Sequence, residues 1–130
     1  TMRSLKTCRL VCVVGWFAAI VVLSLLPPST AQLQFFHLSA LDKLLHAVAY
    51  GGGAALLYWA VGVPGFWRRL GVMVVVPLIL GGVLELVQPL VGRLCSAGDM
   101  LANGAGVVAV AGAISFSRLL SMRRVDAQSV

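Results

Sequence analysis

The sequence carries little charge and very little acid. Of its 130 residues, ten are Lys or Arg and only four are Asp or Glu. Charged residues make up 11% of the chain and hydrophobic residues 60%, whereas a soluble domain is about 25% charged and about 45–50% apolar. So few charges cannot coat a soluble surface, and so hydrophobic a chain is not a disordered one. The composition therefore excludes a soluble globular domain and predicts an integral membrane protein.

The familiar catalytic and framework motifs are also missing. Three cysteines do not make a disulfide framework, and Cys8 and Cys12 have neither a redox nor a zinc-site spacing. The sequence has no nucleophile elbow, no H-E-x-x-H and no phosphate-binding loop. Its single motif histidine, His46, does not supply the pair of histidines expected of membrane lipid phosphatases. These absences leave both an enzyme and a non-catalytic binding protein open.

Four long apolar runs dominate what is present, and they cover residues 10–26, 44–63, 70–91 and 100–120. Each is close to the about 20 residues that one helical membrane crossing needs. Because a backbone in lipid must satisfy its own hydrogen bonds, the runs are expected to be helices. The sequence therefore predicts one all-α domain over residues 1–130, a polytopic bundle of four transmembrane helices.

Basic residues predict the orientation of this bundle. The N-terminal tail carries three, the loop between the second and third runs carries Arg68 and Arg69, and the C-terminal tail carries three more. The other two loops hold only Lys43 and Arg93. Because Lys and Arg concentrate in cytoplasmic loops, both termini are expected in the cytoplasm of a bacterial inner membrane. This topology also accounts for the net charge of +6, so no nucleic-acid partner is expected.

Polar residues gather at the opposite, external end of the predicted helices, inside the apolar runs or next to them. Asp42, His46 and Tyr50 follow at i, i+4 and i+8, which places them on one helix face. Glu85 lies about 9 Å inside the third run at the helical rise, too deep to face lipid cheaply. The candidate catalytic residues are Asp42, His46, Glu85 and Asp99, and the candidate substrate-binding residues are Lys43, Tyr50, Gln88, Arg93 and Asn103.

A purely structural role is open for several of these side chains. Ser39-x-x-Asp42 and Ser96-x-x-Asp99 both resemble capping boxes that start the second and fourth helices. Gln88 and Asn103 have the chemistry to hold neighbouring helices together. The three acids Asp42, Glu85 and Asp99 outnumber the two nearby bases, Lys43 and Arg93. A protonated His46 would balance the charge, and so would a bound divalent cation, since hard ions favour carboxylates.

The polar motifs resemble those of the VanZ-like family. They are Asp42-Lys43-x-x-His46-x-x-x-Tyr50, then Glu85-x-x-Gln88, and then Arg93 followed by Asp99-x-x-x-Asn103-x-x-Gly106. The resemblance covers about residues 40–112 in order and spacing. It departs from the family at Ser96 and at the three glycines 51–53. VanZ-like proteins are small integral membrane proteins, some linked to glycopeptide (teicoplanin) resistance, and the resemblance implies such a role here.

Three functions fit these observations. The first is an enzyme that acts at the outer leaflet on a lipid-linked or cell-envelope substrate. In it His46 would be the base or nucleophile, Glu85 an acid and Arg93 a clamp for a phosphate. The second is a binding or transport-assisting module for a membrane lipid or lipid-linked envelope precursor. The third is a structural scaffold for a membrane partner.

Overall fold

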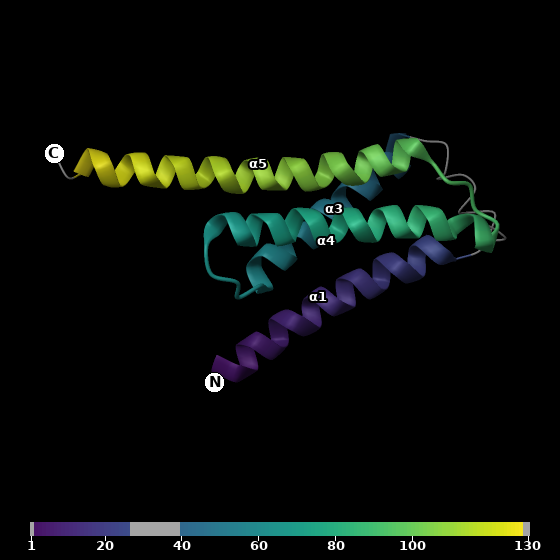
Figure 1. The fold of residues 1–130 in the computed structure, drawn as a ribbon, viewed down its shortest axis with the longest axis horizontal. Helices are drawn as coiled ribbons and strands as arrows, with labels where there is room; N and C mark the ends of the chain where they lie inside the picture. Colours follow the sequence, from purple (N-terminus) through teal and green to yellow (C-terminus); the bar gives the residue numbers. More distant parts are fainter. Residues whose placement is uncertain (1, 27–39, 129–130) are drawn as a thin grey trace.

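The computed structural model describes residues 2–26 and 40–128, and within these ranges it contains helices and no strand. The predicted all-α class is confirmed. The elements are α1 (Met2–Leu25), α3 (Ala40–Ala60), α4 (Phe66–Val87), the short 3₁₀ helix η1 (Gln88–Val91) and α5 (Ala97–Gln128). Figure 1 shows both termini and the α3–α4 connection at one end of the bundle, and the start of α5 and the end of α4 at the other.

The first and last helices extend beyond the apolar runs that predicted them. α1 begins at Met2 rather than at Leu10, and α5 continues to Gln128 instead of ending at Leu120. Hydropathy marks the part of a helix that lipid would cover, whereas backbone hydrogen bonding continues through Lys and Arg into water. α4 begins at Phe66 and ends at Val87, four residues earlier at each end than its run. The chain continues as η1, which contains Pro89 and is followed by Gly92 in the left-handed conformation (φ 78°).

Within residues 2–26 and 40–128, three segments are long and apolar enough to cross a membrane: Ser4–Leu25, Phe66–Val91 and Ala97–Val125. This finding indicates a multi-pass membrane protein. α3 does not belong to this group, because Asp42, Lys43 and His46 lie in its first two turns and three glycines interrupt its apolar run. The crossing by α3 and the sides of the two termini stay predictions.

α3 is the central helix, in contact with α1, α4 and most extensively with α5. The backbones of α3 and α5 touch at two glycines. A Cβ atom on Gly106 would overlap the backbone of Ala47, and one on Gly51 would lie 2.9 Å from the Gly106 carbonyl oxygen. Small residues permit this close approach, and it brings the side chains on either side of Ala47 within reach of α5.

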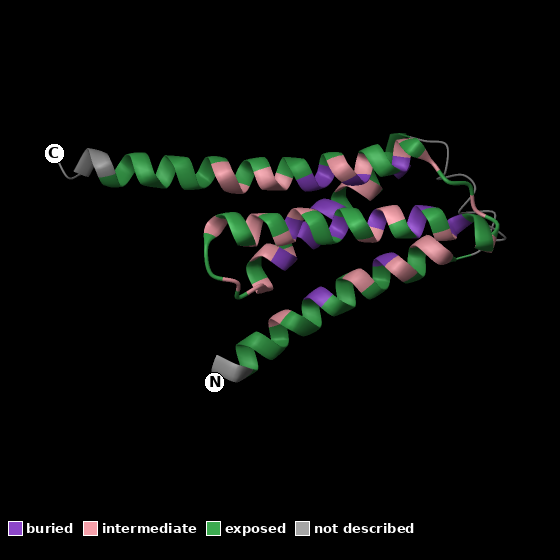
Figure 2. Ribbon diagram, viewed as in Figure 1, coloured by how far each residue is buried: buried purple, intermediate pink, exposed green. Residues whose placement is uncertain are grey.

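The molecule is apolar outside and polar inside at one end. Many large hydrophobic side chains are exposed, among them Leu101 and Phe116, and Figure 2 shows exposed residues on the outer faces of all four helices. The buried hydrophobic cluster is small and includes Tyr50, Met73 and Val107. The buried polar residues are Asp42, Glu85, Gln88, Asp99 and Asn103. This distribution suits a chain whose solvent is lipid.

Candidate functional site

The five buried polar residues lie at the end of the bundle opposite the termini, at the start of α3, the end of α4 and the start of α5. None is more than 7% exposed. Burial of an unpaired charge or polar group costs several kcal/mol, so each side chain needs a partner. Their partners divide them into a cluster around His46 and a set that ties helices together.

His46 is at the centre of the cluster. Its Nδ1 lies 3.0 Å from Asn103 Oδ1, which joins α3 to α5. Because an amide oxygen only accepts, Nδ1 carries a proton in this contact. The other ring nitrogen, Nε2, faces two carboxylates, with Asp42 Oδ1 at 3.9 Å and Asp99 Oδ2 at 3.8 Å. Asn103 therefore fixes the ring so that Nε2 points between the two acids.

Asp99 is available to His46 because another acid caps α5. The Ser96 backbone N–H donates to Glu85 Oε2 at 3.0 Å, and the Asp99 N–H donates to Ser96 Oγ at 3.3 Å. In a complete capping box the third helical residue would accept the bond from the cap residue's N–H. Here Glu85 from α4 takes that bond, so half of the expected box forms. The corresponding residue before α3, Ser39, lies outside the described residues.

Lys43 lies at the rim of the cluster. Its Nζ is 4.0 Å from Asp99 Oδ1, and its side chain is 51% exposed. A Cβ on Gly98 would lie 3.0 Å from Lys43 Cε, so glycine leaves room for this lysine across the start of α5. With His46 neutral, two buried carboxylates face one half-exposed ammonium group, and the cluster keeps a net negative charge.

Tyr50 lies one helical turn deeper than His46. A Cβ on Gly81 of α4 would be 3.0 Å from Tyr50 Cε1 and 3.2 Å from Asn103 Nδ2. Gly81 therefore lets Tyr50 and Asn103 approach α4 closely. The tyrosine ring closes the inner side of the cluster toward the hydrophobic core.

Gln88 and Arg93 turn toward α1 instead of His46. Gln88 Nε2 donates to the Ser24 carbonyl at 3.4 Å, and Arg93 Nη1 donates to the Leu23 carbonyl at 3.0 Å. Both carbonyls belong to the last turn of α1, where they lack intrahelical partners. The pattern of polar residues in the sequence does not reveal these contacts, because the acceptors are backbone groups on a distant helix.

Three side chains have the arrangement of a cation site. One potential ligand atom from each of Asp42, His46 and Asp99 lies within 4.8 Å of the other two. Asp42 Oδ2 is buried and makes no hydrogen bond within the part of the chain that the structure describes. Carboxylate oxygens with one imidazole nitrogen suit a divalent ion such as Zn²⁺ or Mn²⁺. Asn103 would then support the histidine ligand through its other ring nitrogen.

Comparison with known proteins adds no relative. No protein-family model matches the chain, and neither the curated proteins nor the solved structures contain a match. The resemblance to VanZ-like proteins therefore stays a prediction that depends on the motifs quoted above.

Proposed function

We propose that the chain is a VanZ-like multi-pass protein of the bacterial inner membrane, with four crossing helices and both termini in the cytoplasm. The basic residues support this orientation, because they concentrate at the end where the termini and the α3–α4 connection meet (Figure 1). α3 has 21 residues, about 31 Å at the helical rise. Its polar groups do not prevent a crossing, because Asp42 and Tyr50 are buried against other helices and the half-exposed Lys43 lies near the external end of the helix.

The cluster of Asp42, His46 and Asp99 holds a divalent cation in this proposal, near the external surface of the membrane. The observation that carries it is the position of His46 Nε2 between two buried carboxylates, one of which has an oxygen without a hydrogen-bond partner. A bound cation supplies the missing positive charge, and all three side chains coordinate it at once.

Through this cation the site binds the phosphate of a lipid-linked envelope substrate. Two buried acids would repel a phosphate that approached the cluster alone, whereas a bound divalent ion reverses the sign of the local charge. Lys43, half-exposed at the rim, is placed to meet a second anionic oxygen. A role in glycopeptide resistance follows from the VanZ-like resemblance. With the cation bound, Nε2 of His46 is a ligand and Nδ1 donates to Asn103, so the cation-loaded site is a binding module. Turnover with His46 as the base belongs to the alternative in which no cation occupies the cluster.

Metal analysis and native mass spectrometry of gently extracted protein test the proposal together. Wild type is expected to retain one divalent ion and a lipid-linked envelope precursor, and His46→Ala and Asp99→Asn are expected to lose both. Asp126→Asn is the matched control, since position 126 lies about 40 Å beyond position 99 along α5 at the helical rise. A folded wild type with no ion after loading with Zn²⁺ or Mn²⁺ contradicts the proposal. A lipid-linked envelope precursor retained by both cluster variants contradicts the ion's role in binding, whereas a retained glycerophospholipid does not bear on it.

A scaffold function has its own support in three other polar residues. Glu85, Gln88 and Arg93 bond to backbone groups of α5 and α1, which is how residues that fix helix packing behave. If this role dominates, variants of these three residues lose folding yield and ion content together. Cluster variants such as His46→Ala would then fold normally and still support the partner.

A further inference from the structure

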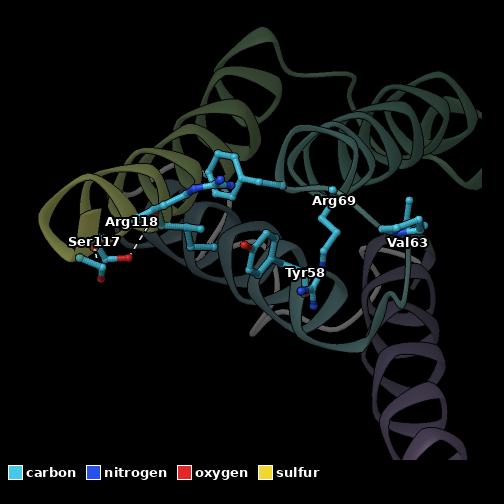
Figure 3. A pocket seen from close by; sticks show the side chains of 10 residues that line it. Tyr58, Val63, Arg69, Ser117 and Arg118 are labelled. Atoms are coloured by element: carbon cyan, nitrogen blue, oxygen red, sulfur yellow. Dashed lines mark hydrogen bonds between the residues drawn. The ribbon is translucent and has the colours of Figure 1, made fainter. Parts of the chain in front are cut away.

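A second polar feature lies at the opposite end of the bundle. It is a cavity of about 630 Å³ between the end of α3, the α3–α4 connection and α5, and Figure 3 shows the side chains that line it. Its charged and hydroxyl-bearing lining residues are Arg69, Ser117, Arg118 and Ser121, together with the hydroxyl of Tyr58. Among the described residues, the lining contains two positive charges and no acid.

Aromatic rings hold both guanidinium groups in place. Arg69 Cζ lies 4.7 Å from the centre of the Tyr58 ring, and Arg118 Cζ lies 4.0 Å from the centre of the Phe66 ring. Arg69 Nη2 also donates to the Tyr58 carbonyl at 2.7 Å. Arg69 Nε is buried and has no hydrogen-bond partner in the described part of the chain. The two arginine side chains are thus held in position without a bound anion, and Arg69 keeps an N–H donor for one.

The first turn of α4 adds to the positive potential. Gly65, at φ 90°, precedes the helix and lines the cavity, and no side chain caps this end. The first turn also contains no acidic residue. The N-terminus of a helix favours anions through its free N–H groups and its dipole. Two guanidinium groups and a helix N-terminus around one cavity are a combination suited to phosphate.

We propose that this cavity binds the phosphate headgroup of an anionic membrane lipid such as phosphatidylglycerol, from the cytoplasmic leaflet. The lipid source is favoured because exposed apolar side chains flank the cavity, with Trp67 76% and Phe116 62% exposed on α4 and α5. These surfaces fit acyl chains, and aromatic residues are typical of the membrane interface. The leaflet depends on the orientation proposed above; the headgroup site does not depend on the cluster around His46.

The test compares lipid retention by full-length protein in native mass spectrometry, with phosphatidylglycerol and phosphatidylcholine as probes. Wild type is expected to retain phosphatidylglycerol at least tenfold better. The double variant Arg69→Gln/Arg118→Gln is expected to lose this preference. Arg68→Gln is the matched control, because Arg68 neighbours Arg69 in sequence but does not line the cavity, and it should behave as wild type.

A second variant keeps the test decisive if the arginine changes impair folding. Ser121→Glu places a carboxylate in the cavity and leaves both arginines intact, so it is expected to abolish the preference. Met122→Glu adds the same charge at the next position, outside the lining, and should retain it. Equal retention of the two lipids by wild type overturns the proposal. Saturable binding of inorganic phosphate without any lipid preference would assign the cavity to a soluble phosphate instead.

Discussion

Glu85 accepts the backbone N–H of Ser96 at 3.0 Å and so performs the capping role that the sequence assigns to Asp99. The Glu85 carboxylate on α4 thereby caps the start of α5, and the Asp99 carboxylate faces His46 and Lys43 instead. One contact between two helices thus links the packing of the bundle to the composition of the His46 cluster.

Glu85→Ala should lower both the stability of the bundle and its cation content. Without an acceptor from α4, the Ser96 N–H is left for Asp99, so that both stability and cation content fall. A lost buried hydrogen bond costs about 1–3 kcal/mol. Glu85→Gln keeps an acceptor oxygen and should lie between wild type and Glu85→Ala. Thermal unfolding in detergent and metal analysis of the same samples measure the two effects; a stable Glu85→Ala protein with full ion content would contradict this role.

Asn103→Ala should weaken cation binding without unfolding the protein. The change removes the acceptor that orients His46 Nδ1, and loss of such a supporting contact typically costs about 10–100-fold in metal affinity. Asn103→Asp restores an acceptor at the same position and should recover most of the affinity. Isothermal titration with Zn²⁺ or Mn²⁺ measures both. Unchanged affinity in Asn103→Ala would remove Asn103 from the site.

Gly106→Ala should separate α3 from α5. The added methyl group overlaps the backbone of Ala47, which cannot move as a flexible side chain can. Overpacking of this kind costs about 1–3 kcal/mol or more, and the cation site should be lost with it because its residues lie on both helices. Gly112→Ala is the control on α5, since its Cβ would meet nothing within 4 Å. The unfolding temperatures of the two variants, compared with wild type, check this prediction.

Trp16→Phe should lower stability modestly and leave the cation site intact. Trp16 Nε1 donates to the Ala49 carbonyl at 2.9 Å, and its ring covers Gly52 and Gly53 of α3. Phenylalanine keeps most of the ring contact and loses the hydrogen bond, worth about 1 kcal/mol net. Trp67→Phe, at an exposed site, should have no effect. Equal unfolding temperatures for both variants would show that the α1–α3 bond contributes nothing.

The native cysteines offer a direct test of the proposed orientation. Cys8 and Cys95 are free and exposed, and they lie near opposite ends of the bundle. In intact cells a membrane-impermeant maleimide is expected to label Cys95 and to spare Cys8 until the membrane is permeabilised. Cys8→Ser/Cys12→Ser and Cys95→Ser variants assign the labelled site. The reverse pattern would place both termini outside and move the His46 cluster to the cytoplasmic side.

Some features of the site were readable from the sequence because they are local. The spacing of Asp42, His46 and Tyr50 places them on one helix face whatever the helix packs against, and the depth of Glu85 excludes a lipid-facing position. Gln88 and Arg93 were predicted as substrate ligands from their neighbourhood alone. Their contacts with the last turn of α1 depend on how the helices cross, which residue spacing does not encode. The sequence does not predict the cavity lined by Arg69 and Arg118 for the same reason. The expected membrane topology already accounts for the positive charges of these two residues.

The sequence by itself indicated that lipid surrounds this protein, that its backbone is helical and that its polar residues gather at one end. These follow from composition and from the energy of groups in lipid, which act residue by residue. Only the tertiary structure decided which polar groups meet. The contact of Gly106 with Ala47 sets how closely α3 and α5 approach, and that approach brings His46 to Asn103 across 57 positions of sequence. Helix rotation and separation arise from packing between distant segments, so they belong to the fold and not to any single segment.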